Sequence, residues 1–172
     1  LWGGVSQSFR APNIADLSRF GKSRSTETEV AATNLDPEKF LTYELGLKGR
    51  LQNVDFTATY YYTEIKDFIS STPTGNIVGG LTEVSKQNSA EGYVQGAELA
   101  ATVSLDENWE LFENVTWMQR KLAADSSIGA GEDSISRIMA LTTNFGLRWT
   151  TADEKLWFEL ACTLTEDADV LS

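Results

Sequence analysis

The chain has 172 residues and carries 25 acidic against 14 basic side chains, which gives a net charge of −11 at neutral pH. Such a chain is not expected to bind nucleic acid, because phosphate neutralisation needs clustered Lys and Arg, and the sequence has no basic patch. Histidine is absent and cysteine occurs once, at Cys162, so the sequence lacks the commonest general base and any cysteine pair for a disulfide or a zinc site.

The first predicted strand covers residues 1–9 and runs into the segment SFRAPN. Pro12 has no N–H to donate to a neighbouring strand, so we expect the pairing to stop there. No alternating pattern resumes until about Phe40, which predicts a long loop over residues 11–39.

Arg10 is predicted to hold the first and second strands in register. It lies in phase with the polar side of the first strand, at the mouth of the long loop. Glu38 and Glu44, near the return of the chain, are its expected partners. The alternative is that Arg10 is a solvated charge at the end of a strand.

Two strands joined by a tight turn are predicted next, from residue 41 to residue 62. Their apolar and polar residues alternate with a period of two, which is typical of strands with one apolar and one polar face. Only Leu51, Gln52 and Asn53 are left for the turn, which is the length of a hairpin connection. The apolar side comprises Leu41, Tyr43, Leu45, Leu47, Leu51, Val54, Phe56, Ala58, Tyr60 and Tyr62.

Later runs with the same alternation bring the predicted number of strands to about seven. They cover residues 93–105, 109–117, 139–149 and 156–164. The pattern has exceptions, because Gln95 and Glu113 fall on the apolar side of their strands and Phe112 falls on the polar side.

The connections between the predicted strands alternate in length. Long connections are expected over residues 11–39, 69–90 and 122–136, and short ones near residues 52, 107 and 152. Every other connection of an antiparallel meander lies at the same end, so all the long ones are expected on one side. A transmembrane barrel has this arrangement, with strands of about 9 to 11 residues. A soluble sandwich also alternates apolar and polar sides, but its strands are usually about 5 to 6 residues long.

Any membrane crossing is expected to use strands. The sequence has neither a signal-peptide pattern nor a run of about 18 apolar residues that could span a bilayer as a helix. Trp2, Trp109, Trp149 and Trp157 lie near the predicted short-turn end, where an aromatic girdle would be expected. Of these, only Trp109 and Trp149 share the phase of the apolar row.

Several segments together resemble the signature region of TonB-dependent outer-membrane receptors. In that family a strand ends in phenylalanine-arginine-alanine-proline, a loop carries asparagine-leucine-x-proline-glutamate, and the return strand reads tyrosine-glutamate-x-glycine-x-lysine. A later strand opens with glycine-x-glutamate. The matching segments are SFRAPN at 8–13, NLDPEKFLTYELGLKGR at 34–50, VDFTATYYYTEIKDFI at 54–69 and GYVQGAELAATVSL at 92–105.

The resemblance implies structural roles for the motif residues. It implies an all-β fold, an antiparallel meander of about seven long strands that is part of a 22-stranded transmembrane β-barrel filled by a plug. Residues 1–172 are expected to be a partial barrel without the plug domain and the terminal strands. The motif residues are Phe9, Arg10, Pro12, Asn34, Pro37, Glu38, Tyr43, Glu44, Gly46, Gly96 and Glu98.

The function implied by the resemblance is active import of a scarce chelate across the outer membrane of a Gram-negative bacterium. A ferric siderophore is the leading cargo; haem, cobalamin, other metal chelates and glycans are further cargo of the family. The expected partners are the TonB complex, reached through the plug, and outer-membrane lipid. No cofactor, resident metal or enzymatic activity is expected.

Basic residues at the first long loop are candidates for binding an anionic ferric chelate, although a solvated loop would have the same composition. They are Arg10, Arg19, Lys22 and Arg24. The strands also carry charged positions that are expected to face a hydrated barrel interior. These are Glu44, Lys48, Arg50, Asp55, Glu98 and Arg148.

Alternative functions remain open at the level of sequence. A passive diffusion channel would share the strands and loops but would lack a plug. A soluble extracellular β binding module would refold without detergent. An outer-membrane enzyme ranks last, because histidine is missing.

Overall fold

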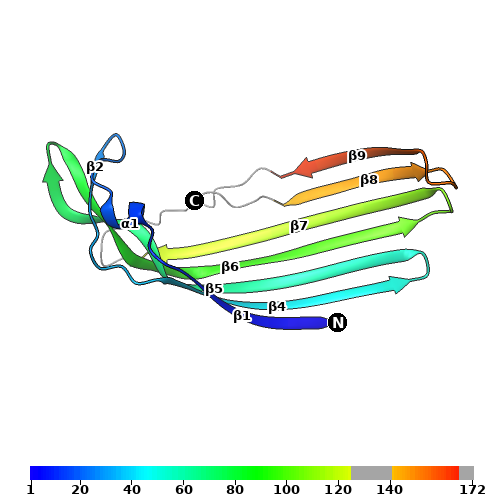
Figure 1. The fold of residues 1–172 in the computed structure, drawn as a ribbon, viewed down its shortest axis with the longest axis horizontal. Coiled ribbons are helices and arrows are strands. Elements are labelled where there is room, and N and C mark those ends of the chain that lie inside the picture. Colours follow the sequence, from blue (N-terminus) through cyan, green and yellow to red (C-terminus); the bar gives the residue numbers. More distant parts are fainter. Residues whose placement is uncertain (125–140, 167–172) are drawn as a thin grey trace.

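The described part of the chain forms one curved sheet in the computed structural model, antiparallel except for one short pairing, and the model describes residues 1–124 and 141–166. The main sheet has the order β1-β4-β5-β6-β7-β8-β9, so strands that follow one another in this series are neighbours (Figure 1). Its strands are β1 (Trp2–Arg10), β4 (Glu38–Leu51), β5 (Val54–Val78), β6 (Leu81–Ser104), β7 (Trp109–Ala124), β8 (Thr142–Thr150) and β9 (Trp157–Thr165).

Three short elements lie between β1 and β4, in the segment 11–37, which we call the first long loop. They are the helix α1 (Ile14–Ser18), β2 (Gly21–Lys22) and β3 (Glu27–Val30). These two short strands raise the number from the expected seven to nine among the described residues. No described helix has the length and apolar character needed to cross a membrane.

The predicted alternation is confirmed by the register of the strands. Leu45 is paired with Tyr60 and Tyr60 with Ala97, so the apolar residues of neighbouring strands share one face. Gln95 and Glu113 lie on this apolar face and Phe112 on the polar face, as their phase predicted. The sheet therefore has one apolar and one polar face along its whole width.

Among residues 1–124 and 141–166, no second layer of structure lies over the apolar face. Leu45 on β4 is 57% exposed and Leu160 on β9 is 67% exposed, although both belong to the apolar rows. A soluble sandwich would bury these side chains between two sheets. The described residues thus form a single layer, as expected for the wall of a barrel.

The predicted loop at 69–90 is wrong, because β5 and β6 continue through it as a hairpin. We call residues 69–88 the outer hairpin; it turns at Gly79 and Gly80, whose φ angles are 60° and 82°. Irregular pairing around Asp67, whose φ is 58°, shifts the register and interrupts the alternation. A period of two is lost at such a bulge, which is why the sequence indicated a loop.

The long and the short connections lie at opposite ends of the sheet (Figure 1). The first long loop and the tip of the outer hairpin lie at one end, which we call the loop end. The tight turns near residues 52, 107 and 152 lie at the other, the turn end. The connection predicted over 122–136 lies largely outside the described residues, since β7 runs to Ala124.

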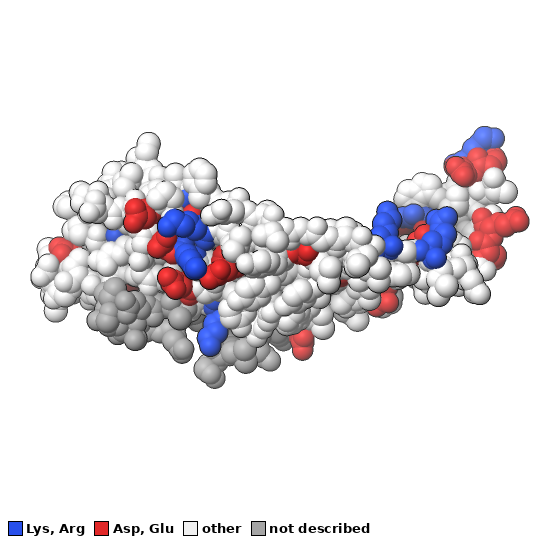
Figure 2. All heavy atoms as spheres, turned by 90° about the horizontal axis from the view of Figure 1, so that it is seen from below, with Lys and Arg blue, Asp and Glu red and all other residues white. Residues whose placement is uncertain are grey.

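Within the part of the chain that the structure describes, buried apolar side chains are few and lie near the loop end, where the first long loop packs on β5 and β6. They are Ala32, Ile65, Ile69, Val84 and Ala90. Charged side chains also gather toward the two ends of the molecule, with a mostly uncharged band between them on the side seen in Figure 2.

Candidate functional site

Arg10 forms a two-pronged ion pair with Glu38 at the loop end. Its Nε lies 2.5 Å from Oε2 of Glu38 and its Nη2 lies 2.7 Å from Oε1. Glu38 is only 1% exposed, and its Oε1 also accepts a hydrogen bond of 2.9 Å from the N–H of Ile69. The predicted pairing of Arg10 is therefore confirmed for Glu38, whereas Glu44 lies opposite Gly4, well along the ladder.

The same guanidinium reaches the first long loop through Asp16. Nη1 of Arg10 donates to Oδ2 of Asp16 at 2.9 Å. Asp16 also closes a capping box with Asn13 at the start of α1: the Asp16 N–H donates to Oδ1 of Asn13, and the Asn13 N–H donates to Oδ2 of Asp16. Arg10 thus fixes the helix start against the ends of β1 and β4, just after Pro12 has stopped the β1 ladder.

The electrostatics of Asp16 reflect these contacts. Burial raises the pKa of the Asp16 carboxyl, but the hydrogen bond from Asn13, the ion pair with Arg10 and the charge of Lys86 act against it. The net result is a pKa below the ordinary value for aspartate. Asp16 therefore stays ionised in the folded loop.

The first long loop also pairs with the outer hairpin through its backbone. Strand β3 lies parallel to β6, with Glu27 opposite Thr82, and the Thr82 N–H donates to the Thr26 carbonyl at 2.9 Å. Asn88 adds a polar bridge, since its side chain accepts from the N–H of Asp36 and donates to the carbonyls of Asp36 and Asp67. The loop is thus a folded part of the sheet edge.

The predicted basic side chains of the loop do not converge on one point. Nε of Arg19 lies 3.3 Å from Glu29, and Nε of Arg24 lies 3.6 Å from Glu27. Lys22 is exposed and has no ion pair within the described part of the chain. Their contact with a chelate stays a prediction.

The glycines of the sequence motifs lie under aromatic rings of their register partners. Gly46 is opposite Trp2, and Gly96 is opposite Tyr61; a Cβ at either glycine would overlap the facing ring. Such a glycine lets a large ring lie flat on the neighbouring strand. The same arrangement joins Gly146 to Phe112 on the polar face.

The other motif residues are spread over both faces and the loop. Phe9 and Tyr43 are exposed on the apolar face. Glu98 and Glu44 lie on the polar face, where Glu98 is exposed and Glu44 is half-buried. Pro12 is half-buried, while Asn34 and Pro37 are exposed in the first long loop. Of the motif residues, Arg10 and Glu38 are the ones in direct side-chain contact.

Sequence reasoning missed three residues that build this region: Asp16, Glu29 and Asn88. The spacing of Asn13 and Asp16 is a capping-box pattern that could have indicated the helix start. Nothing local marks Glu29 or Asn88, because Lys86, which approaches Glu29, and Asp36, which Asn88 contacts, lie far away from them along the chain.

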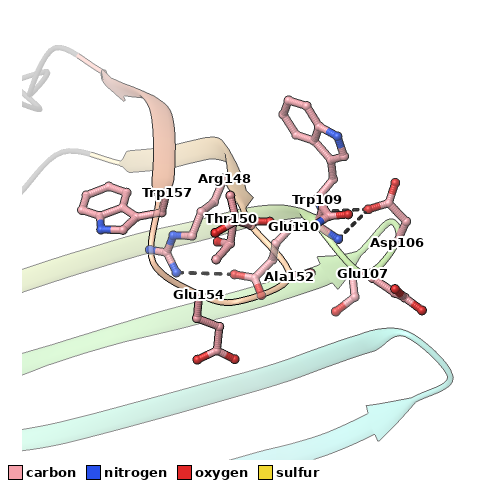
Figure 3. Close-up of a pocket in the computed structure, with 12 residues that line it drawn as sticks. Asp106, Glu107, Trp109, Glu110, Arg148, Thr150, Ala152, Glu154 and Trp157 are labelled. Carbon is pink, nitrogen blue, oxygen red and sulfur yellow. Dashed lines mark hydrogen bonds and ion pairs between the residues drawn. The ribbon is translucent and has the colours of Figure 1, made fainter.

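A polar concavity of about 610 Å³ lies at the turn end, on the connections around residues 107 and 152. Arg148 lines it, and one of its nitrogens lies 3.6 Å from Oε1 of Glu110 (Figure 3). Another of its nitrogens lies 2.7 Å from Oε2 of Glu159. The guanidinium carbon is 5.8 Å from the centre of the Phe112 ring. Arg50 is likewise paired, with Asp55. The predicted charges of the polar face are thus partly neutralised across neighbouring strands.

Comparison with known proteins gives a consistent result. The family model described as "TonB dependent receptor-like, beta-barrel" matches residues 1–166. The siderophore receptor PirA from Pseudomonas aeruginosa is similar in structure, with a TM-score of 0.68 and 23% identity over 94% of this chain and 30% of that chain. The copper transporter OprC has a TM-score of 0.62 and 23% identity over 86% of this chain and 21% of that chain.

A third similar structure is the FrpB iron transporter from Neisseria meningitidis, with a TM-score of 0.60 and 12% identity over 80% of this chain and 20% of that chain. At these identities the three structures support the fold alone. The chain spans less than a third of the length of each of them. Comparison with curated protein sequences returned no match.

Proposed function

Since the chain belongs to the TonB-dependent receptor β-barrel family, we propose that it forms part of the barrel wall of an outer-membrane transporter for a metal chelate. Its apolar face contacts lipid, its polar face lines the lumen and its loop end faces the outside of the cell. A plug and the remaining strands are supplied by other parts of a longer protein. Energy for import comes from the TonB complex, acting through the plug.

The observation that carries this proposal is the single sheet layer of the described residues, whose apolar face they leave uncovered and whose first long loop and outer hairpin lie at the same end. Aromatic pairs mark two levels on that face: Tyr62 stacks on Tyr93, and Trp109 faces Trp149. The distance between the two levels follows from β7, which carries Trp109 at one level and Lys121, the register partner of Tyr93, at the other. With a rise of about 3.4 Å per residue and a strand tilt of about 40°, these two residues are about 30 Å apart along the membrane normal. That matches the hydrocarbon thickness of a bilayer.

A ferric siderophore is the proposed cargo. The proposal draws support from the printed descriptions of the similar structures, a siderophore receptor, an iron transporter and a copper transporter. Lys22, an exposed cation of the first long loop, is available to an anionic chelate. A passive diffusion channel is the second candidate, because it would present the same strands and loops.

Uptake by the full-length receptor tests the proposal. The parent protein is expressed in a Gram-negative host that lacks its own ferric-chelate receptors, and uptake of radiolabelled iron is measured for catecholate, hydroxamate and haem complexes. We expect saturable uptake of one class that stops when TonB is deleted. Uptake that is unsaturable and independent of TonB would favour the passive channel.

A further inference from the structure

Lys86 lies at the junction between the outer hairpin and the first long loop. It belongs to β6, and its side chain is only 23% exposed. Its Nζ donates to Oγ of Ser71 on β5 at 2.9 Å and lies 4.0 Å from Oε1 of Glu29 on β3. The ammonium group thus contacts both strands of the hairpin and the loop.

Glu29 is a buried carboxylate that lacks a full set of donors. Its side chain is 3% exposed, and its Oε2 lies 3.3 Å from Nε of Arg19. Its Oε1 has no hydrogen-bond partner among the described residues. A buried charge is costly unless opposite charges compensate it, and Nζ of Lys86 lies 4.0 Å from this bare oxygen.

Lys86 also completes a series of alternating charges that starts at the ends of β1 and β4. Glu38 contacts Arg10, Arg10 contacts Asp16, and Glu29 contacts Arg19. Lys86 joins the two halves, since its charge contributes to the lowered pKa of Asp16 on one side and it lies near Glu29 on the other. The six residues comprise three acids and three bases, of which only Lys86 belongs to the outer hairpin.

The other attachments between the loop and the hairpin are short. They include the parallel pairing of Glu27–Val30 with Thr82–Ser85, the bridge from Asn88 to Asp36 and the packing of the loop on buried apolar side chains of β5 and β6. A parallel ladder of this length contributes little by itself. The approach of Lys86 to Glu29 therefore adds a charge interaction to a short set of attachments.

We propose that Lys86 is the side chain that holds the first long loop against the outer hairpin, by compensating the buried charge of Glu29. The loop and the hairpin form one exterior unit as long as this contact persists. Loss of the ammonium leaves Glu29 buried beside Arg19 alone, and the loop then opens so that Glu29 can reach water. This inference does not depend on which cargo the barrel carries.

Hydrogen exchange of the full-length receptor in detergent micelles, read by mass spectrometry, tests the proposal. In Lys86→Met we expect amides of residues 11–37 to exchange about tenfold faster, while those of residues 41–62 are unchanged. Lys22→Met is the matched control, because it removes the same charge from an exposed site of the same loop. Unchanged exchange over 11–37 in Lys86→Met would overturn the proposal, as would an equal increase in Lys22→Met.

A double-mutant cycle separates charge compensation from loss of packing. In Glu29→Gln the buried charge is gone, so adding Lys86→Met should change exchange by less than about twofold. Additive effects of the two substitutions would refute the role assigned to Lys86. If Lys86→Met does not assemble, Lys86→Arg serves instead: protection at the wild-type level in low salt and reduced protection in 1 M salt are expected, and protection that does not respond to salt would contradict the proposal.

Discussion

Glu38 is the residue whose environment explains most of the loop end. Its carboxylate is removed from water, and it is satisfied by two donors of Arg10 and by the N–H of Ile69. These contacts join the ends of β1 and β4 to the start of the outer hairpin. A charged hydrogen bond of this kind matters chiefly because leaving the buried acceptor unpaired is costly.

Removing Arg10 should loosen the first long loop strongly. In Arg10→Ala we expect the attachment of residues 11–37 to weaken by about 1–3 kcal/mol, because Glu38 keeps only the Ile69 N–H as a donor. Limited proteolysis of the full-length receptor measures this as faster cleavage within the loop. Arg24→Ala is the control, since Arg24 pairs only with Glu27 at a partly exposed site. Equal cleavage rates in the two variants would contradict the importance of the buried pair.

The lowered pKa of Asp16 predicts how the attachment of the first long loop responds to acid. Its pKa is lowered in the folded loop, so its contribution to stability is fully present above the pKa of the unfolded chain, about 3.9, and is lost as the pH falls through the lower folded value. We expect loop attachment in wild type to be stable from pH 7 to pH 5 and to weaken below about pH 4. A fluorophore on Ser25→Cys in a Cys162→Ser background reports the opening, and Asp16→Asn should reduce the acid response. An acid response that is the same in Asp16→Asn would exclude Asp16 as its source.

At the level of elements, three pairs of neighbouring strands are packed together by an aromatic ring on one strand that lies over a glycine on the other. Trp2 lies over Gly46 between β1 and β4, Tyr61 over Gly96 between β5 and β6, and Phe112 over Gly146 between β7 and β8. Each ring covers the bare backbone of its register partner. These three glycines, of which Gly46 and Gly96 belong to the motifs, are therefore explained by cross-strand packing, since none of them has a positive φ.

Adding one methyl group should disturb such a pair. Gly46→Ala is expected to cost about 1–3 kcal/mol of folding stability in lipid vesicles, because the new Cβ displaces the Trp2 ring. Gly4→Ala is the control, because Gly4 lies on β1 on the same face of the sheet as Trp2 and Gly46, and a Cβ there would have no atom within 4 Å. In a Trp2→Ala background the cost of Gly46→Ala should vanish, and a cost that persists there would point to backbone strain instead.

At the scale of the whole molecule, the described residues form a single curved layer, which favours the receptor interpretation over a soluble module. Its apolar face carries large side chains that nothing in the described residues covers, while its polar face carries paired charges. Such a layer is stable only where lipid covers one side and the barrel closes around the other. The exposed edges β1 and β9 are then covered by neighbouring strands of the complete barrel.

Two adjacent residues of β6 test the assignment of the faces. Leu99→Arg places a charge on the apolar face and should destabilise the full-length barrel in bilayers by about 2–4 kcal/mol, whereas Ala100→Arg on the polar face should cost far less. Urea unfolding in vesicles measures both. If Ala100→Arg were the costlier change, lipid would have to lie on the opposite face.

The alternation of side chains was sufficient to predict the strands of the main sheet, their two faces and the tight turns, because a period of two is a local property of each strand. The pairing of Arg10 with an acid across the loop was also within reach, through its phase and the nearby Glu38. The extent of β5 and β6 was not, because the bulge at Asp67 interrupts the period where the hairpin continues. The contacts of Glu29, Lys86 and Asn88 were decided only by the tertiary structure, since they join segments about 50 residues apart, whose meeting depends on the register of the whole sheet.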